Sequence, residues 1–129
     1  MKHTIFLFGE AEKGAFCTPI LVQSLTQLAD TLGNPPEDTL GITYAVQALL
    51  YERELIYYRV KEEGFSVSDY MRGMKVLNNQ NIIRDLSAIC LPGVGDREII
   101  EAAGSVCCER NTFLIASAKD LYDFLTDWK

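Results

Sequence analysis

The sequence predicts an α/β fold: a three-layer α/β/α sandwich around a four-stranded, mainly parallel sheet, with Rossmann-like, flavodoxin-like topology. Three observations lead to this prediction. First, apolar, β-rich runs recur at residues 4–9, 55–60, 87–93 and 112–117. Second, these runs lack polar alternation, which is typical of strands that are covered on both faces. Third, each run stops at a turn containing Gly or Ser, and a helical pattern of apolar residues follows.

The bulk composition indicates one globular domain over residues 1–129. The chain is 48% hydrophobic and 23% charged, which are ordinary values for a globular protein. The sequence contains no internal repeat, low-complexity stretch or Pro/Gly/Ser-rich linker that would divide it. A chain of 129 residues is long enough to bury a sizeable core in a single domain.

The charge balance excludes some classes of partner. The formal net charge is −6, from 12 basic and 18 acidic residues, and the basic residues are scattered. Nucleic acids and anionic membrane surfaces attract clustered Lys and Arg, so we expect neither as a partner. No apolar run approaches the roughly 20 residues that span a bilayer. We therefore expect a cytoplasmic protein.

The cysteines and the single histidine do not predict a disulfide framework or a metal site. Cys90 lies within an apolar run, and Cys107 and Cys108 are adjacent, so free thiols in a reducing compartment are expected. His3 is the only histidine, and no CxxC pair occurs, so zinc has no plausible ligand set. The sequence leaves any cofactor unknown.

In the first half of the chain, two helices are expected between the first two strands. Thr18 as N-cap and Pro19 at the first helical position predict a helix that ends at Gly33. Residues 34–38 contain two prolines and predict a rigid turn. The apolar positions expected for these two helices are Leu21, Leu25, Leu28 and Leu32, then Ile42, Ala45, Val46, Leu49 and Leu50.

In the second half, each strand is followed by one helix. Residues 61–64 predict a turn in which Glu62 and Glu63 are solvated, and Ser66 or Ser68 caps the next helix. Residues 82–86 fit either a helical turn or the lead into the third strand. Asp96 is a good N-cap for the fourth helix, and Ser117 with Asp120 resembles a capping box for the last one. The C-terminal helix is expected to bury Leu121, Phe124, Leu125 and Trp128.

We expect the four strands to lie in the spatial order 2-1-3-4, joined by right-handed crossovers. The order of the strands then reverses between the first and third strands, and sheets of this kind bind ligands beyond the carboxyl ends of the strands at that point. In this order the strand at residues 55–60 lies at an edge of the sheet.

Two Gly-bearing loops, residues 9–18 and 92–97, would face each other across this crevice. Both lead to an expected helix N-terminus, whose free backbone N–H groups and dipole favour an anion. The expected acid or base residues are Glu10 and Asp96. The expected ligand-binding residues are Gly9, Lys13, Gly14, Cys17, Thr18, Gly93, Gly95 and Arg97. A structural interpretation stands beside each, because Asp96 also fits a simple N-cap and Glu10 and Lys13 fit a solvated loop.

Cys17 is the thiol with the most suggestive position. It precedes the expected N-cap Thr18, so the helix dipole would lower its pKa and favour the thiolate. Because no second histidine is present to act as a base, the interpretation that we favour is a small buried cysteine.

The sequence therefore predicts a domain that binds a small anionic or nucleotide-like ligand at the carboxyl ends of the first and third strands. No catalytic motif, GxGxxG fingerprint or P-loop occurs, so a reaction is not assigned. The alternative is a non-enzymatic interaction module or homo-oligomeric assembly module, in which the strand at residues 55–60 pairs with its copy across a two-fold axis.

Overall fold

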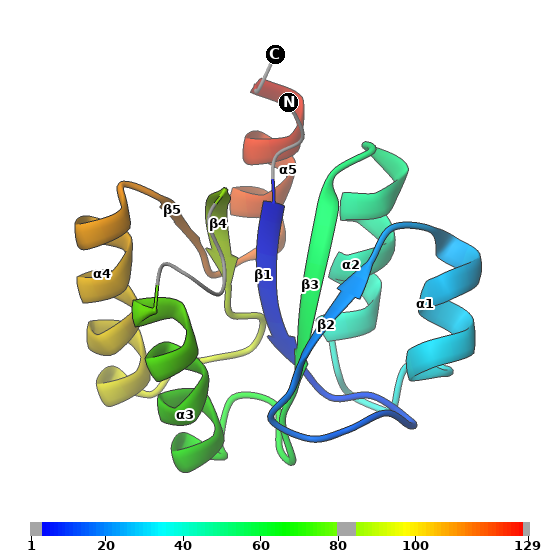
Figure 1. Ribbon diagram of the computed structural model, residues 1–129, viewed down its shortest axis with the longest axis horizontal. Helices are drawn as coiled ribbons and strands as arrows, with labels where there is room; N and C mark the ends of the chain where they lie inside the picture. The colour runs from blue at the N-terminus through cyan, green and yellow to red at the C-terminus, as the bar shows by residue number, and fades with distance from the viewer. Residues whose placement is uncertain (1–3, 80–84, 128–129) are drawn as a thin grey trace.

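The chain folds around a mixed sheet with the strands in the order β2-β3-β1-β4-β5 (Figure 1). The computed structural model describes residues 4–79 and 85–127. The strands are β1 (Thr4–Gly9), β2 (Pro19–Val22), β3 (Glu54–Arg59), β4 (Leu86–Cys90) and β5 (Phe113–Ile115). The helices are α1 (Leu25–Leu32), α2 (Gly41–Leu50), α3 (Val67–Asn78), α4 (Arg97–Arg110) and α5 (Ala118–Asp127).

The four strands expected from the sequence are all present, and their predicted order is confirmed. They run parallel as β3-β1-β4-β5, with β1 at the centre. Leu7 of β1 lies opposite Tyr57 of β3 on one side and Cys90 of β4 on the other. The order of the strands reverses between β1 and β4, so the carboxyl ends of these two strands mark the expected crevice.

The strand β2 was not predicted, and the expectation of a four-stranded sheet is wrong. Thr18 does not cap a helix: Pro19–Val22 forms β2, antiparallel to β3, with Ile20 opposite Tyr57. The first helix begins later, at Leu25, where the Ser24 hydroxyl accepts the Gln27 N–H at 3.1 Å. The short apolar run at β2 gains backbone pairing along an edge of β3 that would otherwise be open, and this tertiary gain outweighs the local helix signal.

Because β2 covers β3, the strand at residues 55–60 is not an edge, and that expectation is also wrong. The side chain of Gln27 bonds to the outer edge of β2 at the end of the strand. Its amide donates to the Leu21 carbonyl and accepts the Gln23 N–H, both at 2.9 Å. The predicted self-pairing through residues 55–60 therefore has no free strand to use.

Helices cover both faces of the sheet. On one face, α3 and α4 lie side by side and enclose a core that includes Phe6, Phe8 and Tyr58 (Figure 1). On the other face, α1, α2 and α5 enclose a core that includes Leu7 and Tyr57. Tyr57 and Tyr58 thus point to opposite faces, as the strand pattern predicts.

Two of the predicted helix caps are confirmed. The Asp96 carboxylate accepts the Ile99 N–H at 3.1 Å at the start of α4. The Ser117 hydroxyl accepts the Asp120 N–H at the start of α5, also at 3.1 Å. Ser66 occupies the N-cap position of α3, but its hydroxyl bonds to Glu62 rather than to the helix.

Some expectations fall outside the described residues, namely those for His3, for residues 82–84 and for Trp128. Leu86 does begin β4. All four cysteines are free: Cys90 and Cys107 are buried, and Cys108 is exposed. Over residues 4–79 and 85–127, the helices are too short or too polar to cross a membrane.

Candidate functional site

Beyond the carboxyl ends of β1 and β3, several turns meet around a carboxylate of the chain itself, that of Glu63. The turns that follow β1 and β3 meet here with the N-terminus of α2. The Glu63 side chain, from the turn after β3, lies at the centre and is only 9% exposed. Its Oε2 atom would lie 3.8 Å from a Cβ placed on Gly93, in the turn after β4.

Three backbone N–H groups converge on the Glu63 carboxylate. Its Oε1 atom accepts from the Glu10 N–H and from the Gly41 N–H, each at 3.0 Å. Its Oε2 atom accepts from the Leu40 N–H at 2.6 Å. Two of these donors lie at the N-terminus of α2, on the N-cap residue Leu40 and on the first helical residue Gly41, where a helix has free N–H groups and the positive end of its dipole. The arrangement is that of a backbone anion site.

The turn after β1 is fixed from the other direction as well. The Glu10 carboxylate accepts the Glu63 N–H at 2.9 Å, so the two glutamates bond to each other's backbone. The Tyr57 hydroxyl donates to the Glu10 carbonyl at 2.6 Å. Gly9 and Gly41 allow this packing, because a Cβ on either one would collide with the Tyr57 hydroxyl.

Burial is the largest cause of the pKa shifts of the two titratable side chains Glu63 and Tyr57. Burial raises the pKa of Glu63 above its ordinary value, although the three backbone N–H groups lower it, and the charge of Glu10 raises it further. Burial, followed by the charge of Glu63, also raises the pKa of Tyr57. Tyr57 therefore stays protonated near neutral pH and serves as a donor.

The expectation that Glu62 and Glu63 are both solvated is wrong for Glu63 and right for Glu62, which is exposed. An acidic pair in a turn usually diverges into solvent, and here only one of the two does. No local feature of residues 61–64 distinguishes the two glutamates. The signal lies in the fold, which brings free N–H groups from residues 10, 40 and 41 to the Glu63 side chain.

Of the residues expected at the site, Gly9, Glu10 and Gly93 lie at the Glu63 carboxylate. The others do not reach it through any described contact. Lys13, Gly14 and Thr18 are exposed, and the Lys13 N–H donates to the Leu32 carbonyl at the end of α1. Gly95 has open space where a Cβ would lie.

The two charged residues expected on the second loop are occupied elsewhere. The Asp96 carboxylate accepts the Ile99 N–H and so caps α4. Arg97 is 90% exposed and lies 4.0 Å from Glu101 on the same helix. Among the described residues, the donors that meet the Glu63 carboxylate are therefore backbone N–H groups and not the side chains of Lys13 and Arg97.

Cys17 precedes a strand and not a helix, so the helix dipole that could have lowered its pKa is not present. Burial raises the pKa of the Cys17 thiol, and its hydrogen bond with Asp69 raises it further. The residue has a φ of 52° and donates its N–H to the Arg59 carbonyl at 2.9 Å, which extends the pairing of β2 with β3. Cys17 is a protonated, half-buried thiol on the α3 side of the sheet.

No family model, curated protein or solved structure matches this chain. Within the part of the chain that the structure describes, no three His, Cys, Asp or Glu side chains come close enough together to hold a metal ion.

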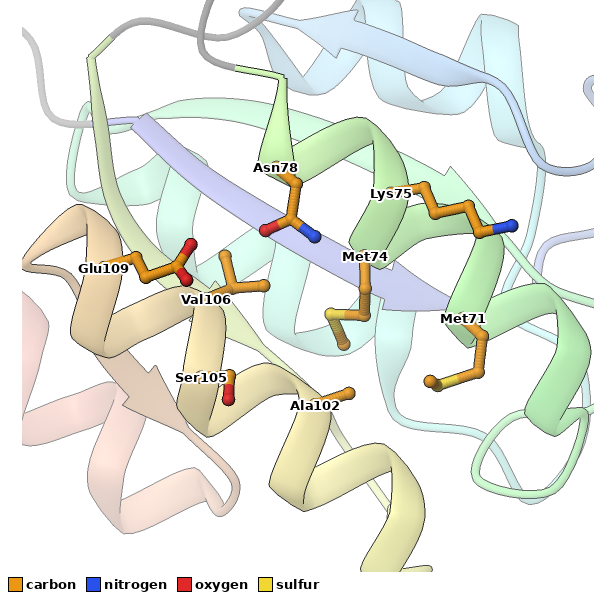
Figure 2. Close-up of a pocket in the computed structure, with 8 residues that line it drawn as sticks. All are labelled: Met71, Met74, Lys75, Asn78, Ala102, Ser105, Val106 and Glu109. Carbon is orange, nitrogen blue, oxygen red and sulfur yellow. The ribbon is translucent and has the colours of Figure 1, made fainter.

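A second concavity lies away from the crevice, between α3 and α4 (Figure 2). This α3–α4 groove has a volume of about 300 Å³. The side chains that line it are Met71, Met74, Lys75 and Asn78 from α3, and Ala102, Ser105, Val106 and Glu109 from α4. Its floor is apolar and its rim carries one basic and one acidic side chain.

Proposed function

We propose that this chain binds a small anionic molecule at the carboxyl ends of β1 and β4, with its acidic group in the place that the Glu63 carboxylate fills. The observation that carries the proposal is the convergence of three backbone N–H groups on that carboxylate. A site that already holds one anion has the donors that another anion needs.

The position within the sheet supports the same proposal. The parallel part, β3-β1-β4-β5, follows the strand order of a doubly wound, flavodoxin-like sheet, and such sheets bind ligands where the order reverses. The donor arrangement favours a carboxylate, because two N–H groups serve one oxygen and the third serves the other, as the planar Glu63 carboxylate shows.

In this proposal, Glu63 is a competitor tethered to the site. Its carboxylate is present at a high effective concentration, so a ligand binds only by replacing its three hydrogen bonds. Burial and the nearby Glu10 charge already disfavour the ionised Glu63, which lowers the cost of displacing it. We assign no reaction, because Glu10 and Asp96 both have structural partners.

A thermal-shift screen with nucleotides, sugar phosphates and small dicarboxylates tests this proposal on the wild type, Glu63→Ala and Glu62→Ala. Glu62 is the matched control, since it is the exposed neighbour in the same turn. We expect a compound that stabilises the wild type to bind Glu63→Ala about tenfold more tightly or better, because the tethered competitor is gone.

Two results would overturn the proposal. One is that no compound of these classes stabilises either the wild type or Glu63→Ala. The other is that a compound stabilises the wild type, Glu63→Ala and Glu62→Ala equally, which would place its site elsewhere.

A further inference from the structure

One buried side chain near the proposed anion site has no polar partner. Tyr44 lies in the first turn of α2, three residues after Gly41, and its N–H donates to the Leu40 carbonyl at 2.9 Å. The residue is only 5% exposed, yet its hydroxyl forms no hydrogen bond within residues 4–79 and 85–127. A buried tyrosine hydroxyl usually has a hydrogen-bond partner, so this one is available to a bound molecule.

The Tyr44 side chain lies where α2, α5 and the end of β4 come together. It packs in the same core as Cys90, the last residue of β4. Burial raises the pKa of Tyr44 most, and the charges of Glu63 and of Asp120, in the first turn of α5, raise it further. The hydroxyl is therefore protonated near neutral pH and lies within electrostatic range of both carboxylates.

The side-chain charges that act on this region are negative. The charge of Glu10 raises the pKa of Glu63, as the charges of Glu63 and Asp120 raise that of Tyr44. The groups that bind the Glu63 carboxylate are uncharged backbone N–H groups. A ligand that places one carboxylate on these N–H groups would meet repulsion with a second negative charge and attraction with a positive one.

Taking the proposed function as given, we propose that the ligand of this site is an amino acid. Its carboxylate binds the three backbone N–H groups, and its ammonium group lies beside the Tyr44 hydroxyl. The ammonium donates to the hydroxyl oxygen and is attracted by Asp120 and by the displaced Glu63 carboxylate. Donors for one end of the ligand and acceptors for the other select a zwitterion over a simple carboxylate or a dicarboxylate.

Three amino acids whose amine lies at increasing distance from the carboxylate test the proposal on Glu63→Ala: glycine, β-alanine and γ-aminobutyrate. Each is compared with the carboxylate that lacks the amine, namely acetate, propionate and butyrate. The dependence of the melting temperature on ligand concentration gives each affinity. Glu62→Ala keeps the Glu63 carboxylate in the site and corrects for general effects of the solutes. We expect at least one amino acid to bind about tenfold more tightly than its matched carboxylate, or better.

Tyr44→Phe in the Glu63→Ala background tests the position of the amine. The substitution keeps the ring and removes only the hydroxyl. We expect the favoured amino acid to bind at least about fivefold more weakly and its matched carboxylate to bind as before. Tyr51→Phe makes the same change at an exposed tyrosine at the other end of α2, and it should alter neither affinity.

The carboxylates without an amine separate the two proposals. If they stabilise Glu63→Ala as well as the amino acids do, the anion site stands and this inference is wrong. The inference is also wrong if succinate, in which a carboxylate replaces the amine of β-alanine, binds more tightly than β-alanine. A preference for an amino acid that survives Tyr44→Phe contradicts it as well. If none of these compounds stabilises Glu63→Ala, the proposed function fails, and this inference fails with it.

Discussion

At the scale of single residues, the molecule depends on an unusual glutamate. Glu63 is buried at the meeting point of three turns, and its carboxylate takes N–H groups from residues 10, 40 and 41. A buried carboxylate is costly unless it is hydrogen-bonded, and here three backbone donors compensate for the loss of water. The side chain thus joins β1, β3 and α2 at one point.

The substitution Glu63→Gln tests this role. The amide keeps the shape of the side chain, but its NH₂ group would face a backbone N–H, either that of Leu40 or those of Glu10 and Gly41. A donor facing a donor leaves both groups unsatisfied, so we expect the free energy of unfolding to fall by about 1–3 kcal/mol. Urea denaturation followed by circular dichroism measures the change.

Comparing the unfolding free energies of the wild type and Glu63→Gln at different pH values tests the direction of the Glu63 pKa shift. Because the folded-state pKa is raised from the ordinary value of 4.5, the folded chain holds the proton over a pH range in which the unfolded chain has lost it. The stability contributed by this shift is fully present below pH 4.5 and is lost as the pH rises through the folded-state pKa. The wild type should therefore exceed Glu63→Gln in unfolding free energy by more at about pH 4 than at about pH 7. A difference that grows toward pH 7 would mean that the three N–H groups outweigh burial.

At the scale of elements, the segment after β1 is where the secondary structure predicted from the sequence was wrong. Thr18 and Pro19 are a good helix start, and Leu21, Leu25, Leu28 and Leu32 have helical spacing. The helix does exist from Leu25 to Leu32, but Pro19–Val22 is a strand. Local signals could not distinguish the two, because the strand is stabilised by its pairing with β3, which lies more than thirty residues later in the chain.

The true start of α1 can be tested with a pair of substitutions. Ser24→Ala removes the hydroxyl that accepts the Gln27 N–H, so we expect a loss of about 1 kcal/mol in unfolding free energy. Thr18→Ala removes only an exposed hydrogen bond to the Phe16 carbonyl, so we expect a loss of less than about 0.5 kcal/mol. Chemical denaturation of both variants measures the difference. If Thr18→Ala were the more costly substitution, the helix would begin where the sequence alone suggested.

At the scale of the whole molecule, the sequence predicted the parallel strands but not the buried glutamate near their carboxyl ends. Apolar runs without alternation locate the strands β1, β3, β4 and β5, and right-handed crossovers account for their order. That order predicts a site near Gly9, Glu10 and Gly93, and the Glu63 carboxylate lies beside these three residues. The role of Glu63 was missed because it lies 53 residues away in sequence from Glu10, whose backbone N–H it accepts. No pattern in its own turn distinguishes it.

The sequence attributed the positive character of the predicted site to Lys13 and Arg97, whereas the groups that meet the Glu63 carboxylate are backbone N–H groups. Lys13 and Arg97 are the basic residues nearest to the Gly-bearing turns in sequence, and both are exposed. The donors that act there are backbone N–H groups, which every residue except proline carries. A site built from such groups depends on the fold and leaves little trace in composition or motif.

The central claim is that the backbone around Glu63 forms an anion site, and the melting temperature of Glu63→Ala in acetate tests it most directly. The substitution removes the carboxylate and leaves three N–H groups without it, and acetate supplies a carboxylate of the same shape. We expect acetate, compared with chloride at equal ionic strength, to raise the melting temperature of Glu63→Ala by about 2 °C or more. The wild type and Glu62→Ala should show no such difference between the two salts. Equal melting temperatures of Glu63→Ala in acetate and chloride would contradict the claim.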